Sequence, residues 1–188
     1  MEKVSFNPRA TAYPMPVAIV GATVNDKPNF MTVAWFSKVN INPPMMMIAV
    51  GNQKYTGEGI KENMAFSINI PGKDLVKETD YCGIKSGRTE DKSKLFKVFY
   101  GETGTTPMIQ ECPINYELKL AETVELPGSN LFIGEIVAAY TDKKSLSGQI
   151  PDLPKTEPFI LVVSPTRHYY DLGPQIADAF KIGKDLTK

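Results

Sequence analysis

Short apolar runs separated by polar, proline- or glycine-containing turns recur along most of the chain. The most continuous run, Met45 to Val50, follows Pro43-Pro44. The two prolines stop a regular ladder because proline lacks a backbone N–H. A solid apolar run of this length is typical of a strand buried on both faces. We therefore expect a buried strand here, ended by the polar turn from Gly51 to Thr56.

The segment before the two prolines, Phe30 to Val39, has the β-branched and aromatic content of a strand. Side chains alternate between the two faces of a strand. One face then carries Met31, Val33 and Trp35, and the other carries Thr32, Ala34 and Phe36. A polar turn at 25–28 precedes this segment, so it is expected to pair with the apolar segment 17–24 as a hairpin.

The rest of the chain continues the pattern of short strands. Further strands are predicted at 65–70, 114–125, 131–140, 159–163 and 168–172. Helices are predicted at 56–63, at 71–82 with Gly83 as C-cap, and at 175–182, where the last one closes the domain. Many strands and few helices indicate a mainly β barrel with short peripheral helices, formed by one domain over residues 1–188.

Composition narrows the classes of function. The 188 residues carry 21 basic and 21 acidic side chains, so the chain lacks the basic footprint that nucleic acid requires. The apolar runs are too short to span a bilayer, and the N-terminal residues do not resemble a signal peptide. A cytoplasmic protein without a membrane partner is therefore expected. Cys82 and Cys112, thirty residues apart, are interpreted as packed, reduced thiols.

Candidate chemistry is sparse. The chain has neither a G-x-G-x-x-G segment after a strand nor a G-x-x-x-x-G-K-[ST] loop, which excludes a Rossmann nucleotide site and P-loop chemistry. Lys54, Tyr55 and Thr56 lie at a strand end before a predicted helix, a place that suits a phosphate. A solvated turn with a threonine N-cap is the alternative interpretation. His168, the single histidine, is interpreted as structural, and no metal site is predicted.

Several motifs, in order, resemble one family. N-x-M-T-V-A-W-F at 29–36, the two prolines and K-Y-T at 54–56 are similar to the flavin reductase-like proteins with an FMN-binding split β-barrel, of the flavoredoxin type. The matches continue as D-Y-C-G at 80–83, S-G-R at 86–88, D-K at 91–92, E-C-P at 111–113, L-F-I-G-E at 131–135 and Y-Y-D-L-G at 169–173. Together they cover roughly residues 10 to 175.

This resemblance implies a Greek-key split barrel, FMN as cofactor and a homodimer with FMN near the subunit interface. By this resemblance, the residues that bind the flavin phosphate in the family correspond to the 54–56 turn and to Lys92. The strand that lies against the flavin ring in the family corresponds to residues 29–35. Asn130 occupies a position where relatives often carry histidine; it can hydrogen-bond the cofactor but supplies no cation. The predicted cofactor-binding residues are Asn29, Thr32, Val33, Ala34, Trp35, Lys54, Tyr55, Thr56, Lys92 and Asn130.

The function implied is that of an FMN-dependent oxidoreductase in which the flavin supplies the chemistry, so no catalytic side chain is assigned. One form is an NAD(P)H-dependent reductase of flavin or a ferric complex, with NADH or NADPH stacking transiently over the flavin. A second form is an electron carrier between redox protein partners, the flavoredoxin role. From other classes, a non-catalytic flavin-binding protein and a β-barrel interaction domain without a cofactor remain as alternatives.

Overall fold

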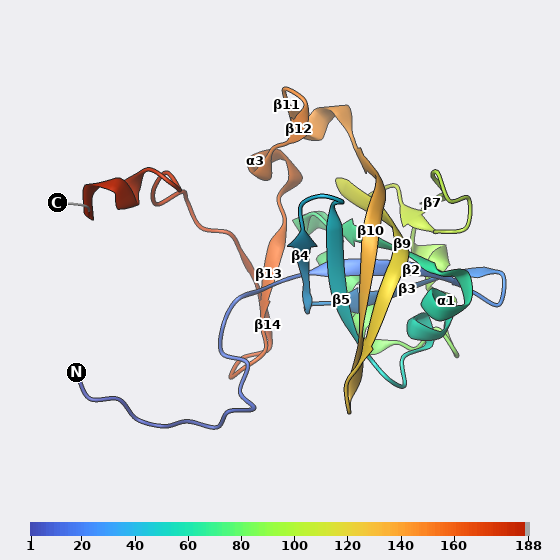
Figure 1. The fold of residues 1–188 in the computed structure, drawn as a ribbon, viewed down its shortest axis with the longest axis horizontal. Helices are drawn as coiled ribbons and strands as arrows, with labels where there is room; N and C mark the ends of the chain where they lie inside the picture. The colour runs from blue at the N-terminus through green and yellow to red at the C-terminus, as the bar shows by residue number, and fades with distance from the viewer. Residues whose placement is uncertain (187–188) are drawn as a thin grey trace.

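A computed structural model describes residues 1–186 of the chain. Its main element is an antiparallel sheet of seven strands in the order β3-β2-β6-β9-β10-β5-β4 (Figure 1). The strands are β2 (Ala18–Val24), β3 (Lys27–Val33), β4 (Phe36–Asn40), β5 (Met45–Gly51), β6 (Ala65–Ile70), β9 (Ile114–Glu125) and β10 (Ser129–Thr141). The fold is mainly β, as predicted, and is that of a split β-barrel.

Long, irregular strands curl this sheet into a barrel. The β9–β10 pairing shifts register between Ile133 and Gly134 and again between Ile136 and Ala138. Such irregularities bend a strand and increase its twist. At Gly134 an added Cβ atom would lie 2.8 Å from the Phe66 ring and 2.9 Å from Cβ of Leu118, so glycine leaves room for these two core side chains. The two edge strands of this sheet, β3 and β4, follow each other directly in the chain.

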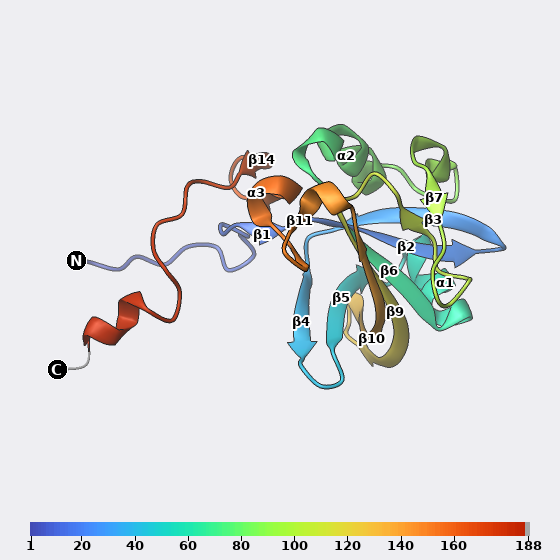
Figure 2. The ribbon, with the colours of Figure 1, turned by 90° about the horizontal axis from the view of Figure 1, so that it is seen from above.

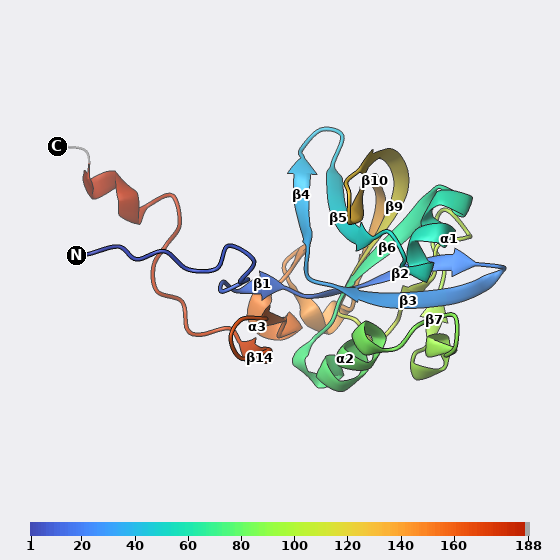
Figure 3. The same ribbon diagram turned by 90° about the horizontal axis from the view of Figure 1, so that it is seen from below.

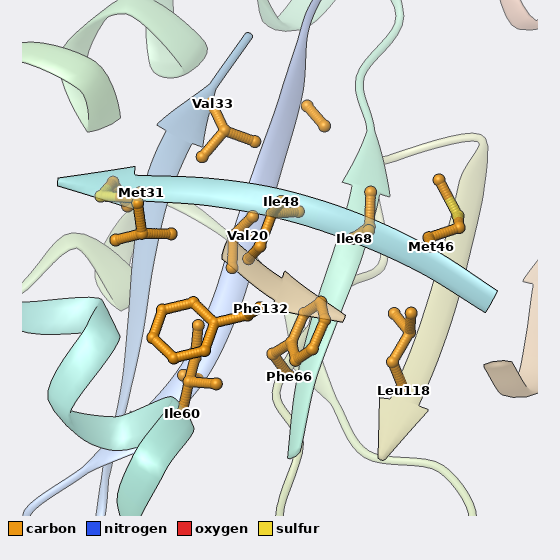
Figure 4. Close-up of a cluster of buried hydrophobic side chains, with 13 residues drawn as sticks. Val20, Met31, Val33, Met46, Ile48, Ile60, Phe66, Ile68, Leu118 and Phe132 are labelled. Atoms are coloured by element: carbon orange, nitrogen blue, oxygen red, sulfur yellow. The ribbon is translucent and has the colours of Figure 1, made fainter. Parts of the chain in front are cut away.

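Apolar side chains from six strands and one helix fill the barrel (Figure 4). Phe66, Phe132 and Ile60 are fully buried at its centre. The labelled members of this cluster are Val20, Met31, Val33, Met46, Ile48, Ile60, Phe66, Ile68, Leu118 and Phe132. Burial of this apolar area supplies most of the stability of the fold.

A second, smaller cluster lies on the outer side of β2 and β3. It contains Phe30 and Phe96, whose rings meet edge to face at 5.5 Å, together with Cys82 and Cys112. Both cysteines are buried free thiols, and burial raises the pKa of Cys82 to about 11 and that of Cys112 well above its usual value. Both thiols are therefore protonated at neutral pH, in keeping with their interpretation as packed, reduced side chains.

Short helices and two-stranded ladders surround the barrel (Figures 2 and 3). The helices are α1 (Tyr55–Asn63), α2 (Val76–Ile84), α3 (Leu153–Thr156) and the 3-10 turns η1 (Lys73–Leu75), η2 (Lys92–Leu95), η3 (Lys143–Ser145) and η4 (Ile182–Leu186). The remaining strands are β1 (Met15–Pro16), β7 (Val98–Phe99), β8 (Met108–Ile109), β11 (Leu146–Ser147), β12 (Ile150–Pro151), β13 (Phe159–Val162) and β14 (His168–Asp171). No helix within residues 1–186 is long and apolar enough to cross a membrane.

Two strand predictions need correction. The predicted strand 30–39 is broken at Ala34-Trp35, because β3 pairs with β2 whereas β4 pairs with β5. Trp35 consequently does not share the core face of Met31 and Val33, and 55% of it is exposed. The 45–50 run forms β5, but only alternate side chains are buried in this chain, so the strand is not buried on both faces.

Two helix predictions were also wrong in part. The predicted helix 71–82 begins as η1 and continues as α2 through Gly83 to Ile84, so Gly83 is not the C-cap. The predicted helix 175–182 is absent; η4 begins only at Ile182. Ile176 and Phe180 have no apolar surface of their own chain to pack against, and without such packing a short helix is not stable.

Candidate functional site

One wall of the candidate site is the N-terminus of α1. Lys54 is the N-cap residue, and no side chain caps this helix end. The first turn therefore presents backbone N–H groups without intrahelical partners, together with the positive end of the helix dipole. Thr56 is 2% exposed, and its hydroxyl oxygen accepts a 2.7 Å hydrogen bond from Nδ2 of Asn29 on β3.

The opposite wall is the end of α2 and the loop that follows it. Lys92 comes from η2 and is only 3% exposed; its ammonium donates to the backbone carbonyls of Cys82, at 3.2 Å, and Lys85, at 2.8 Å. Burial lowers the pKa of this ammonium; Cys82 opposes the shift, and the charge of Lys54 adds to it. Lys54 and Lys92 line the same cavity, and neighbouring cations favour an anion between them.

A cavity of about 230 Å³ separates the two walls. Its lining residues are Met31, Gln53, Lys54, Tyr55, Thr56, Cys82, Gly83, Ile84, Lys85, Ser86, Gly87 and Lys92. Three of them are lysines, and no acidic side chain lines this cavity within the described part of the chain. Cations, a buried hydroxyl and free helix N–H groups are the donors that a phosphate group needs, so the residues present fit the phosphate of a flavin nucleotide.

Four of the ten predicted residues line this cavity: Lys54, Tyr55, Thr56 and Lys92. Asn29 joins them through its bond to Thr56. Thr32 lies behind the far wall, where its hydroxyl donates to the carbonyl of Thr79 in α2. The site residues come from β3, α1 and η2, so the sheet and the two helix ends together determine their positions.

The other predicted residues do not line the cavity. Val33 packs in the barrel core, Ala34 is half-buried and Trp35 is largely exposed. Asn130 lies on β10 opposite Val50, near the turn that leads to α1. Within segment 32–35, exposure thus runs from the buried Val33 to the exposed Trp35, and none of the four residues lines the cavity.

Sequence reasoning did not assign the 83–87 loop to the site, although S-G-R at 86–88 was among the matching motifs. Gly87 lines the cavity, and an added Cβ atom would lie 3.0 Å from the Tyr55 ring and overlap the Asn29 amide oxygen. Only glycine lets the loop approach so closely. The S-G-R motif at 86–88, which matches the family, is the sequence signal that could have identified this wall.

A second cavity, of about 350 Å³, adjoins the first and shares Tyr55 and Gly87 with it. Arg88 lines this cavity; its guanidinium lies 4.8 Å from the centre of the Tyr55 ring and pairs with Glu58. Arg88 therefore holds Tyr55 at the boundary between the two cavities by a cation–π contact.

A hydrogen bond fixes the position of α2, which carries the far wall. The hydroxyl of Tyr169 on β14 donates to Asp80 on α2 at 3.0 Å. Burial and this bond raise the pKa of Tyr169 to about 12, so the bond persists at physiological pH. The three-stranded sheet β1-β13-β14 is thereby joined to the helix that ends at the cavity.

Comparison with known proteins identifies the family. Residues 10–170 match the model of the flavin reductase-like domain. The crystal structure of flavoredoxin from Methanosarcina acetivorans is 46% identical, with 99% of this chain and 100% of that chain covered and a TM-score of 0.96. Flavoredoxin of Desulfovibrio vulgaris (Miyazaki F) is 36% identical, with 97% and 100% covered and a TM-score of 0.88.

A further relative matches a shorter part of the chain. A protein from Archaeoglobus fulgidus is 32% identical over 127 residues, which are 66% of this chain and 71% of that protein. The family model covers most of the chain, and both flavoredoxin structures cover nearly all of it. This membership supports flavin binding and a redox function. The chain thus belongs to the flavin reductase-like family of split-barrel flavoproteins and is of the flavoredoxin type.

Proposed function

We propose that this protein binds FMN and acts as an oxidoreductase that takes hydride from NADH or NADPH and passes the electrons to a flavin or a ferric complex. The observation that carries the proposal is the cationic cavity between α1 and η2, which Met31 at the end of β3 also lines. The cavity suits the FMN phosphate, and the flat ring would lie against the residues that follow Met31, up to the exposed Trp35. Bound FMN supplies the redox chemistry through its ring, whose N5 accepts hydride.

The residues of the chain bind and orient this cofactor. Lys92, Lys54 and Thr56 hold the phosphate together with the first N–H groups of α1. Segment 32–35 offers backbone donors and acceptors to the polar rim of the ring, and Trp35 covers apolar surface beside it. The protein acts as a homodimer, in which the second copy encloses the side of the ring that one chain leaves open. Asn130 serves the same cofactor near the turn before α1.

A second candidate is an electron carrier between redox protein partners. The observation that favours it is the 46% identity, over nearly the whole chain, to a protein described as a flavoredoxin. The two candidates share the cofactor site and differ in the donor. A non-catalytic flavin-binding protein would share the site too, but would have no preferred donor or acceptor.

The test is an absorbance spectrum of the purified protein, followed by anaerobic addition of NADH and, separately, of NADPH. If the protein is a reductase, the flavin absorbance bands are expected to bleach on the time scale of one turnover after NADH or NADPH is added. Bands that persist with both nucleotides, yet bleach with a reduced redox protein, would replace the reductase by the carrier. A colourless protein that also fails to bind added FMN would refute both.

Thr56→Ala is expected to weaken FMN binding by about 1–3 kcal/mol, because it removes a hydroxyl bonded to a charged phosphate. The change also leaves Nδ2 of Asn29 without its 2.7 Å acceptor. Thr56→Ser keeps the hydroxyl and is the matched control. Titration of the apoprotein with FMN, followed by flavin fluorescence, measures the difference; equal affinity of the alanine and serine variants would remove Thr56 from the site.

A further inference from the structure

Strand β3 places three features in a fixed order. It runs from its turn with β2 to the start of β4 (Figure 3). Lys27, Pro28 and Asn29, at the start of β3, line the second cavity of about 350 Å³. Met31 lines the cationic cavity, and residues 32–35, where β3 ends, are those assigned to the flavin ring. Because a strand advances about 3.3 Å per residue, the second cavity, the phosphate site and the ring follow one another along its axis.

The second cavity adjoins the phosphate site. Tyr55 and Gly87 line both cavities. Asn29 lines the second cavity, and its Nδ2 donates at 2.7 Å to the hydroxyl of Thr56, which lines the first. A ligand whose phosphate occupies the cationic cavity can therefore continue past Tyr55 and Gly87 into the second cavity.

The side chains that line the second cavity are of several chemical kinds. They include two cations, two carboxylates and an amide: Lys27 and Arg88, Glu90 and Asp91, and Asn25. Cations bind phosphate oxygens, carboxylates accept hydrogen bonds from ribose hydroxyls, and an asparagine amide matches the donor and acceptor edge of adenine. The volume falls within the range of about 300–1,000 Å³ that small-molecule sites occupy. This combination fits a nucleotide better than it fits a simple anion.

The charged groups of the second cavity are available to a ligand. Within residues 1–186 the side chains of Lys27 and Glu90 have neither a hydrogen-bond partner nor an ion-pair partner. Arg88 pairs with Glu58, but these two side chains are 50% and 54% exposed. Exposed ion pairs contribute little to stability. A phosphate can therefore replace Glu58 as the partner of Arg88 at small cost.

We propose that the second cavity is an adenylate subsite: it binds the adenosine 5′-phosphate half of flavin adenine dinucleotide (FAD), while the flavin half occupies the cationic cavity and segment 32–35. The inference rests on the proposed function, because both assign the flavin phosphate to the cationic cavity. In FAD the ring, the two phosphates, the ribose and the adenine follow one another in the order that β3 presents. Lys27 and Arg88 then bind the second phosphate, and Glu90 accepts hydrogen bonds from the ribose hydroxyls.

A nicotinamide dinucleotide carries the same adenylate group and is the other source of this chemistry. Its nicotinamide must stack on the flavin ring, at the end of β3 that leads to Trp35. Its adenylate would then have to pass the phosphate of the bound flavin before it reached Lys27. FAD reaches the second cavity through its own diphosphate and passes no other anion. The order of the features along β3 therefore favours the cofactor over the electron donor.

The test compares the dissociation constants of FAD and FMN for the apoprotein, measured by isothermal titration calorimetry. FAD is expected to bind about 10-fold more tightly than FMN, because its adenylate half adds charge-assisted contacts. Lys27→Gln removes a cation that lines the second cavity and not the first, so it is expected to reduce this preference about 5-fold and to leave FMN affinity unchanged. Lys61→Gln is the matched control: this exposed lysine of α1 pairs with Glu125 at 3.6 Å, and the preference is expected to persist.

Each other outcome contradicts a different step. FAD that binds no more tightly than FMN would overturn the adenylate subsite and leave the proposed function standing. A preference for FAD that is the same in Lys27→Gln and the wild type would overturn its assignment to the second cavity. Binding of ADP-ribose to the FMN-loaded wild type that is lost in Lys27→Gln, without a preference for FAD, would assign the cavity to the donor nucleotide instead. Failure to bind either flavin would refute the proposed function and this inference together.

Discussion

Replacing Lys92 with alanine is expected to weaken FMN binding by about 1–3 kcal/mol, which is a factor of about 5 to 150 in the dissociation constant. The ammonium is almost completely buried and points at two carbonyl groups that form the wall of the cavity. Its loss removes a cation from the phosphate site and also releases the carbonyls of Cys82 and Lys85. The measurement is titration of each apoprotein with FMN.

Two further variants separate the possible causes. Lys92→Met keeps most of the aliphatic stem but loses the ammonium, with its charge and its two hydrogen bonds, so it is expected to bind FMN about as weakly as the alanine variant. Lys94→Ala removes a lysine from the same 3-10 turn, but Lys94 is exposed and pairs with Asp91 at 3.6 Å. It is expected to leave affinity unchanged within experimental error. Loss of affinity in Lys94→Ala equal to that in Lys92→Ala would show a general effect of net charge and remove Lys92 from the site.

One wall of the candidate cavity could be predicted because local sequence encodes it. Lys54, Tyr55 and Thr56 are consecutive and begin a helix, so the polar turn already indicated where helix N–H groups would be free. Lys92 could not be found in this way. It is 36 residues from Thr56, and only the fold brings the two together across a cavity. A lysine beside an aspartate looks like surface charge in the sequence, and the resemblance to a family was needed to single it out.

The segment predicted to lie against the flavin ring shows a different limit. Alternation placed Met31, Val33 and Trp35 on one face, but the chain changes strand partners at Ala34-Trp35 without a glycine or proline to signal the break. The cause is tertiary: β3 must pair with β2, and β4 must pair with β5. Similarly, the apolar spacing of 175–182 was read as a helix that closes the domain, whereas its apolar residues have no partner within the chain. A hydrophobic pattern indicates which side chains favour burial, but it does not show whether the fold supplies a surface that buries them.

Gly59→Ala is expected to destabilise the fold by about 1–3 kcal/mol, although glycine to alanine in a helix normally stabilises. Gly59 lies in the middle of α1 at the point where the helix crosses β2. An added Cβ atom would lie 2.6 Å from Cγ2 of Val24 and still closer to the carbonyl oxygen of Thr23. That carbonyl also accepts a 2.8 Å hydrogen bond from Asn63 of the same helix, so the helix cannot move outwards without breaking it. Steric overlap therefore outweighs the gain in helix propensity.

Gly57→Ala, two residues earlier in the same helix, is the matched control with the opposite sign. Its added Cβ atom would meet Val50 at 3.6 Å and Phe132 at 3.7 Å, which are ordinary contacts. The higher helix propensity of alanine then determines the effect, and the free energy of unfolding is expected to rise by about 0.5–1 kcal/mol. Urea unfolding of both apoproteins at the same protein concentration measures the difference in the free energy of unfolding. A change of the free energy of unfolding in the same direction in both variants would contradict this prediction. The contact between α1 and β2 would then not be what holds the N-terminal end of α1 in place.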